Sequence, residues 1–185
     1  MIELIQKSRD KNIKTDLNAV DTARYRAYID IETTGLSSCY CDLTLIGIAL
    51  EKHGRCQVVQ LYEDTLTPQR LLDTLRYVEE LYSYNGSRFD LPFIDAKLGV
   101  NLKKYFRHTD LMYDCWRNNL KGGLKEVERR LGIERRLCNI DGFMAVQLWH
   151  EYKNNNSKSA LKMLLEYNSE DVLNLRILRS KLSVK

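Results

Sequence analysis

The stretch "YIDIETTGL", residues 28–36, combines the pattern of a core strand with two carboxylates. Its apolar residues favour a buried strand, and Gly35 favours a sharp turn at the end of that strand. Asp30 and Glu32 are separated by one residue, and a strand places such residues on the same face. Like charges this close repel each other and lose their hydration, so the two carboxylates need a compensating group.

Length and composition are those of an ordinary globular domain. The chain has 185 residues, of which 44% are hydrophobic and 29% charged, and its formal net charge is +4. These values suit one domain with a full core and are compatible with a polyanionic partner. No apolar run approaches the ~20 residues of a membrane span, and no secretory signal is visible. We therefore expect a cytoplasmic protein with no membrane partner and with reduced cysteines; Cys39 and Cys41 lack a second Cys/His pair at zinc-site spacing.

Strand patterns dominate the first part of the chain and helix patterns the rest. We expect an N-terminal appendage at residues 1–24 and one domain at residues 25–185. Short links between the first three strands predict an antiparallel meander. The expected strands are 26–32, 43–50, 56–62, 82–85 and 108–112. A first helix is expected to begin at Thr67–Pro68. Further helices are expected at 91–98, 111–119, 124–131, 142–153, 159–167 and 170–182. This order predicts an α/β fold with a mixed central β-sheet flanked by α-helices.

Two further acidic residues occupy positions where a helix meets the core. Asp90, in "YNGSRFDLPFI", stands before Leu–Pro at the start of a helix, where an N-cap is the simplest interpretation. Asp171 falls on the apolar stripe of the last helix, where a lone aspartate needs a cation, a donor or a metal. Tyr167 lies over the same face one turn earlier, and an ordinary core aromatic is the alternative there.

Four carboxylates are thus candidates for a single site: Asp30, Glu32, Asp90 and Asp171. No Arg or Lys is adjacent in sequence to the first pair. Oxygen ligands without His or Cys favour Mg²⁺ or Mn²⁺. Two such ions, ~4 Å apart and sharing several carboxylates, form the kind of site that cleaves phosphodiesters. Metal would also supply the positive charge that the strand pair lacks.

Three motifs resemble those of a known enzyme family, the DEDD exonuclease superfamily. Asp30-x-Glu32 followed by Thr-Thr-Gly-Leu resembles its first motif. Asn85-x-x-x-Phe89-Asp90 resembles the second motif, and the wider string is similar to that of family B polymerase proofreading domains. The third motif has two forms, and the chain matches the tyrosine form with Tyr167-x-x-x-Asp171, which is typical of the DEDDy subclass.

The segments between these motifs extend the resemblance. "GGLKEVERRLGI" (122–133), "DGFMAVQLWHEY" (141–152) and "ALKMLLEYNSEDVLNL" (160–175) are similar to the YprB-like group of predicted 3′–5′ exonucleases. The likeness covers nearly the whole chain after residue 24. It implies an RNase H-like fold and a metal-dependent 3′–5′ exonuclease. The implied partners are single-stranded DNA or RNA 3′ ends, with DNA favoured, and the implied products are nucleoside 5′-monophosphates.

The resemblance also implies a role for each motif residue. Asp30, Glu32 and Asp171 would hold one Mg²⁺ or Mn²⁺ ion. Asp30 would also hold a second ion, with Asp90 contacting it directly or through water. Tyr167 would orient the attacking water, since a reference pKa of ~10 makes tyrosine a poor general base at neutral pH.

Substrate contacts are expected from four residues: Leu36, Asn85, Phe89 and Lys125. Leu36 and Phe89 would stack or wedge bases, and Lys125 belongs to a basic segment, residues 121–136, whose cations would follow phosphates. Ordinary packing is the alternative for Leu36, and a solvated amphipathic face is the alternative for the basic segment.

Two other functions remain open at this point. A non-catalytic RNase H-like module that binds nucleic acid or a protein partner would be expected to have lost one of the four acids or the tyrosine. None is lost, which favours the enzyme. An endonuclease of the same fold is the second alternative, and the Tyr-x-x-x-Asp spacing argues against it.

Overall fold

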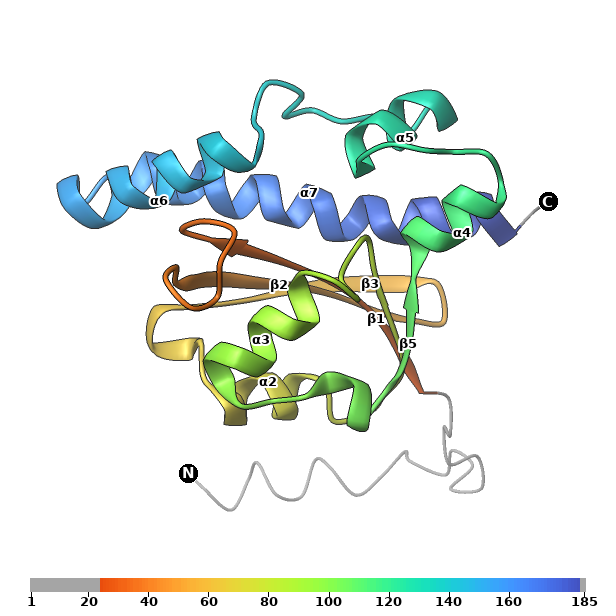
Figure 1. Ribbon diagram of the computed structural model, residues 1–185, viewed down its shortest axis with the longest axis horizontal. Helices are drawn as coiled ribbons and strands as arrows, with labels where there is room; N and C mark the ends of the chain where they lie inside the picture. The colour runs from red at the N-terminus through yellow and green to blue at the C-terminus, as the bar shows by residue number, and fades with distance from the viewer. Residues whose placement is uncertain (1–23, 184–185) are drawn as a thin grey trace, which may run out of the picture.

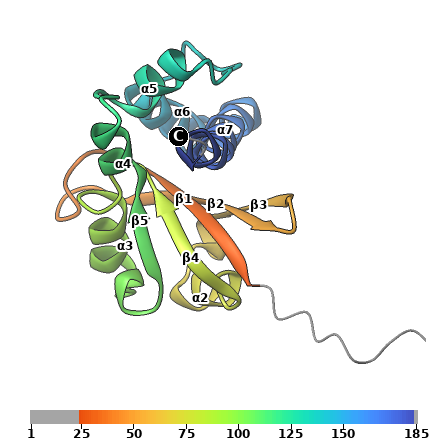
Figure 2. The same cartoon turned by 90° about the vertical axis from the view of Figure 1, so that its right-hand side faces the viewer.

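A five-stranded sheet lies between two layers of helices in the computed structural model of the protein, which describes residues 24–183 (Figure 1). Helices α6 (Gly142–Asn155) and α7 (Lys158–Ser183) cover one face of the sheet, with α5 (Leu124–Leu131) lying against α7 on the side away from the strands, and α2 (Pro68–Thr74) and α3 (Asp90–Leu98) cover the other face (Figures 1 and 2). This arrangement confirms the expected α/β fold with a mixed central sheet. The appendage expected at residues 1–24 lies, apart from its last residue, outside the described residues.

The sheet is built around its first strand. Strands β1 (Tyr25–Thr33), β2 (Leu43–Lys52) and β3 (Arg55–Tyr62) form the expected antiparallel meander. Strands β4 (Val78–Ser83) and β5 (Arg107–Asp110) continue the sheet in parallel on the other side of β1, which gives the order β3-β2-β1-β4-β5. Strand β1 is therefore central, and both of its faces are covered.

The helices agree with the expected positions except at the end of the chain. They are α2 (Pro68–Thr74), α3 (Asp90–Leu98), α4 (Leu111–Arg117), α5 (Leu124–Leu131), α6 (Gly142–Asn155) and α7 (Lys158–Ser183), with short 3₁₀ turns at Glu63–Thr65 and Leu102–Lys104. Helix α2 starts where it was expected, and Thr67 caps it, because its hydroxyl accepts a hydrogen bond from the Arg70 amide at 3.2 Å.

The two helices expected at 159–167 and 170–182 are one continuous helix of 26 residues, α7. The expected break fell at Asn168 and Ser169, which are poor helix formers because their side chains compete for backbone hydrogen bonds. Asn168 does not compete in this way, since its amide bonds other side chains across the sheet. No Gly or Pro interrupts the segment. A single helix can therefore span the whole face of the sheet.

The alternation of β1 assigns its side chains to two different layers. Ile29 and Ile31 belong to the apolar core beneath α2 and α3. Tyr28 belongs to the core on the opposite face, beneath α4 and α7. Asp30 and Glu32 share the face of Tyr28 because residues two apart in a strand point the same way. The fold therefore turns both carboxylates toward α7.

Candidate active site

Two of the four candidate acids come from neighbouring positions of β1. Asp30 pairs with Gly47 of β2, and Glu32 pairs with Leu45. Glu32 is only 7% exposed, and its Oε1 atom is buried without a hydrogen-bond partner among the described residues. A buried carboxylate oxygen without a donor is costly, so it marks a place where a further group fits.

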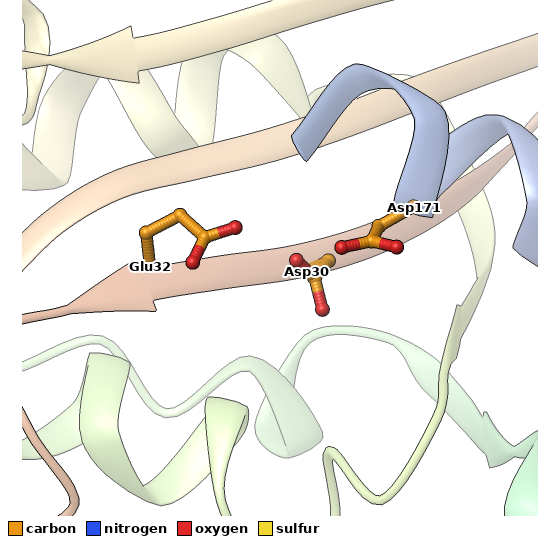
Figure 3. A group of neighbouring side chains, drawn as sticks. All are labelled: Asp30, Glu32 and Asp171. Atoms are coloured by element: carbon orange, nitrogen blue, oxygen red, sulfur yellow. The ribbon is translucent and has the colours of Figure 1, made fainter. Parts of the chain in front are cut away.

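Asp171 brings a third carboxylate to the same place from α7. One oxygen from each of Asp30, Glu32 and Asp171 lies within 4.8 Å of the other two. Figure 3 shows the side chain of Asp171 reaching from α7 toward the two acids on β1. This is the meeting of strand and helix that the stripe position of Asp171 indicated. The roles of the three residues remain a prediction.

The electrostatic state of the strand pair follows from this crowding. Burial raises the pKa of Asp30 well above its ordinary value, and the charges of Asp171, Asp90 and Glu32 raise it further. Burial is also the main cause of the strongly raised pKa of Glu32, followed by Asp171. Hydrogen bonding from Asn168 opposes both shifts. The site therefore disfavours the ionised form of both carboxyls, although the charge of Lys125 also lowers the pKa of Glu32.

Asp90 lies beside this group but not within it. It is the first residue of α3, and its Oδ1 accepts a hydrogen bond from the Ile31 amide on β1 at 3.2 Å. The carboxylate therefore faces β1 rather than capping its own helix, and Phe89 occupies the N-cap position without a side-chain cap. Burial raises the pKa of Asp90 to about 7, and the charges of Asp110 and Asp171 contribute.

The loop before Asp90 is fixed by an acid that the sequence reasoning missed. The carboxylate of Asp110 accepts hydrogen bonds from the amides of Asn85 at 2.7 Å and Ser87 at 2.9 Å. It also accepts one from the Met112 amide and so caps α4. Its position before a helix was a signal for the cap, but the loop contact joins segments 23 to 25 residues apart. Asp110 thereby holds the turn from which Asp90 starts.

A buried arginine faces Asp171. Arg135 lies in the loop between α5 and α6, and 6% of its side chain is exposed. Its Nε and Nη2 each donate to the Glu128 carboxylate at 2.8 Å, and Nη2 also donates to Asp171. Burial raises the pKa of Asp171, and the charge and hydrogen bond of Arg135 oppose that rise without cancelling it. The helix acid therefore has a full positive charge beside it.

The loop that carries Arg135 is fastened to α7. The carboxylate of Glu170 accepts hydrogen bonds from the amides of Arg136 at 2.7 Å and Leu137 at 3.0 Å. A helix expected to begin at residue 170 would make Glu170 an acid of the first turn, but α7 begins at Lys158, three turns earlier. Glu170 instead binds the loop and keeps Arg135 in place.

Tyr167 lies one turn before Asp171 and is 7% exposed. The Lys125 ammonium lies 4.8 Å from its ring centroid, and the Arg135 guanidinium lies 5.9 Å from it. Burial raises the pKa of the Tyr167 hydroxyl far above its ordinary value, and the nearby carboxylates raise it further. The hydroxyl therefore keeps its proton at neutral pH.

The residues expected to contact substrate are spread around the group. Leu36 is 88% exposed in the loop after β1, whereas Phe89 packs against the core beneath α3 beside Phe93. Asn85 lies in the turn held by Asp110, with a positive φ of 62°. Lys125 donates to the Ile140 carbonyl oxygen. Substrate binding by these four residues remains a prediction.

The basic segment at 121–136 is largely engaged within the protein. Arg129 forms an ion pair with Glu126, and Arg130 donates to two backbone carbonyl oxygens. Arg135 is buried against Glu128. These contacts favour a structural role for the three arginines over a role in binding the phosphates of a nucleic acid.

The donor set fits a divalent cation. Asp30, Glu32 and Asp171 offer only carboxylate oxygens, which suit Mg²⁺ or Mn²⁺. A site that needs added positive charge should have carboxylates with unsatisfied oxygens and raised pKa values. Glu32 has an unpartnered Oε1 among the described residues, and the pKa values of Asp30 and Glu32 are raised.

Comparisons with known proteins give the same fold. The family RNase_H_2, described as the RNase_H superfamily, matches residues 27–183. The chain is 30% identical to the protein YprB of Bacillus subtilis (strain 168), over 85% of this chain and 42% of YprB. It therefore spans less than half of that relative. Within residues 24–183, no helix is long and apolar enough to cross a membrane.

Solved structures extend the likeness at lower identity. The family B DNA polymerase of the archaeon Pyrobaculum calidifontis is 17% identical, with a TM-score of 0.65 over 86% of this chain and 24% of the polymerase. Brucella melitensis NrnC with bound Mg²⁺ is 22% identical, with a TM-score of 0.59 over 85% of this chain and 71% of NrnC. A structure of NrnC bound to pGG gives a TM-score of 0.58 at the same identity, over 85% of this chain and 71% of NrnC. These matches show a shared fold.

Proposed function

We propose a nuclease function for this chain, which belongs to the RNase_H superfamily. In detail, we propose a metal-dependent 3′–5′ exonuclease of the DEDDy subclass that removes nucleoside 5′-monophosphates from single-stranded DNA or RNA, with DNA preferred. The observation that carries the proposal is the convergence of Asp30, Glu32 and Asp171 within 4.8 Å, with an unpartnered carboxylate oxygen among them.

The acids would bind the cofactor. Asp30, Glu32 and Asp171 would hold a Mg²⁺ or Mn²⁺ ion, and Asp30 with Asp90 would contribute to a second. Bound divalent ions would lower the pKa of water and offset the charge that develops on the phosphate and the leaving oxygen. Asp90 would contribute to the second ion through Oδ2, because its Oδ1 accepts the hydrogen bond from the Ile31 amide.

Tyr167 would position the attacking water without taking its proton. Its hydroxyl keeps its proton because of the strongly raised pKa, so it can donate one hydrogen bond and accept another. The ring is buried and lies beside Lys125 and Arg135, which limits its movement. A fixed hydroxyl would orient the water before it reacts. The cost of orienting two separate molecules is a large part of the barrier to their reaction.

The structural neighbours support a nucleic-acid substrate. NrnC has been solved with Mg²⁺ and with pGG, and its fold covers most of this chain. The Pyrobaculum calidifontis structure is a DNA polymerase. Oxygen-only ligands beside a tyrosine are also suited to phosphodiester hydrolysis, because a two-ion site stabilises both the attacking and leaving oxygens.

The test is a product analysis on single-stranded DNA and RNA labelled at the 5′ end. We expect a ladder that shortens from the 3′ end with Mg²⁺ or Mn²⁺, release of nucleoside 5′-monophosphates, and no reaction with EDTA. A 3′-phosphate-blocked oligonucleotide serves as the matched control for polarity and should be degraded more slowly. Internal cuts would indicate an endonuclease. Binding without cleavage in either metal would indicate the non-catalytic module.

A further inference from the structure

Asn168 lies between Gln60 of β3 and Asp30 of β1. It lies on α7 three residues before Asp171 and is completely buried. Its Nδ2 donates to Asp30 Oδ2 at 3.1 Å, and its Oδ1 accepts from Gln60 Nε2 at 3.1 Å. The side chain thus connects β3, at one side of the sheet, to the carboxylate on the central strand.

The direction of each hydrogen bond in this connection is fixed by a backbone group. Gln60 Nε2 also donates to the Leu165 carbonyl oxygen at 2.9 Å, and a carbonyl oxygen can only accept. Gln60 must therefore present its NH₂ group here, and Asn168 must turn its oxygen toward Gln60. The NH₂ group of Asn168 is then left to face Asp30. The carbonyl oxygen of Leu165, in α7, therefore determines that Asn168 donates to Asp30.

Gly47 provides the space for this amide. It is the residue of β2 that pairs with Asp30, so the two share one face of the sheet. A Cβ atom at position 47 would lie 1.9 Å from Asn168 Oδ1 and 2.7 Å from its Cγ. Any side chain there would displace the amide from the Asp30 carboxylate.

We propose that Asn168 is a positioning residue for the metal ligand Asp30, oriented by Gln60 and accommodated by Gly47. The inference rests on the proposed function, since it concerns the same metal site. A neutral amide suits this place because it orients the carboxylate without adding a positive charge that would repel a cation. Groups that orient metal ligands typically contribute 10- to 100-fold, as a rough range, to metal affinity.

The experiment measures Mn²⁺ binding by titration calorimetry, without substrate. Asn168→Leu removes the donor while keeping similar bulk, and we expect the dissociation constant to rise by about 10- to 100-fold. Gln60→Leu leaves the donor but frees its orientation, and we expect a rise of roughly 2- to 10-fold, the smaller share of the same effect. Gln57→Leu is the matched control, since Gln57 is an exposed glutamine on the same strand, and its affinity should equal that of wild type.

Two further variants separate positioning from mere folding. Gly47→Ala changes no polar group, yet should weaken Mn²⁺ binding as Asn168→Leu does, because its Cβ displaces the amide. The double variant Gln60→Leu with Asn168→Leu should bind no more weakly than Asn168→Leu alone, because Gln60 acts through Asn168. Activity of each variant should return toward the wild-type rate as Mn²⁺ is raised to saturation. A purely structural role would not produce that recovery.

The outcomes distinguish this inference from the proposed function. If wild type binds no Mn²⁺, the proposed metal site is wrong. If wild type binds Mn²⁺ and Asn168→Leu binds it equally well, the metal site stands and the positioning role is overturned. If Asn168→Leu does not fold, Gln60→Leu and Gly47→Ala decide, and unchanged affinity in both overturns the inference.

Discussion

Asp171 and the strand pair are held at the same site in opposite ways. The helix acid lies against Arg135, a buried arginine that is itself bound to Glu128. Asp30 receives only a neutral amide, from Asn168. Asp171 therefore has a counter-charge hydrogen-bonded to it, whereas Asp30 has a neutral donor and Glu32 has only the charge of Lys125, which lowers its pKa without an ion pair between them among the described residues.

The difference shows where added positive charge would have its largest effect. A buried ion pair is satisfied within the protein, although its desolvation is costly. An amide orients a carboxylate but does not neutralise it, which agrees with the strongly raised pKa values of Asp30 and Glu32. We infer that a divalent ion would stabilise the β1 side most, while Asp171 is already in place before metal arrives.

The largest expected effect tests whether the two sides are equal in catalysis. Asp30→Asn and Asp171→Asn should each reduce single-turnover cleavage by roughly 1,000-fold or more, because each removes a charge from the proposed metal ligands. Rates with saturating Mn²⁺ on a labelled oligonucleotide provide the measurement. If Asp171→Asn kept most of its activity while Asp30→Asn lost it, Asp171 would be only the partner of Arg135.

The next effect concerns stability without metal. Arg135→Gln leaves Glu128 and Asp171 buried without their cation, and should lower the free energy of unfolding by about 3–5 kcal/mol. Asn168→Leu removes a neutral donor and should cost less, about 1–3 kcal/mol. Urea unfolding in EDTA measures both, with exposed Arg129→Gln as the control. Equal losses of unfolding free energy in Arg135→Gln and Asn168→Leu would show that the charged partner of Asp171 and the neutral partner of Asp30 contribute alike.

Tyr167 lies beside both sides and should affect the rate alone. Tyr167→Phe keeps the ring and removes the hydroxyl, so single-turnover cleavage should fall by roughly 10- to 1,000-fold. Mn²⁺ affinity should stay within about twofold of wild type, because the ligands are untouched. Tyr167→His should not restore the rate. A wild-type rate in Tyr167→Phe would show that the subclass assignment is wrong.

The smallest effect is a pH dependence that belongs to the strand side. The pKa of Asp30 is raised in the folded protein, so its ionisation costs stability once the pH exceeds the unfolded value of ~3.9. In metal-free buffer, Asp30→Asn should therefore melt close to wild type at pH 4 and a few degrees, roughly 2–6 °C, above it at pH 7. Saturating Mg²⁺ should reverse this order at pH 7. A variant that melts below wild type at pH 7 without metal would mean that Asp30 has a structural role.

Local pattern was sufficient for much of the fold. The alternation at residues 28–32 indicated a central strand with its acids on one face, and Thr67–Pro68 indicated the start of α2. Both depend on interactions within a few residues. The error at Asn168 arose because helix propensity ignores a side chain that finds its partners on another element.

The surroundings of the acids could not be predicted in this way. Arg135 and Asp171 are 36 residues apart, and Gln60 and Asn168 are 108 residues apart. Neither pair has a local sequence signature. In the sequence, Arg135 cannot be distinguished from the other basic residues of segment 121–136. The acids themselves were identifiable because a carboxylate on an apolar face contradicts its own neighbours. A neutral amide such as Asn168, or a glycine such as Gly47, does not stand out from its neighbours in this way.

The central claim is that Asp30, Glu32 and Asp171 bind a catalytic divalent ion. Anomalous diffraction from crystals soaked in Mn²⁺ tests it most directly. The account predicts a peak among these three carboxylates, with ligand distances near those of small divalent ions, about 2.1 Å. Crystals of Asp30→Asn should lack that peak. No peak in wild type at saturating Mn²⁺, or a peak that contacts none of the three, would contradict the account.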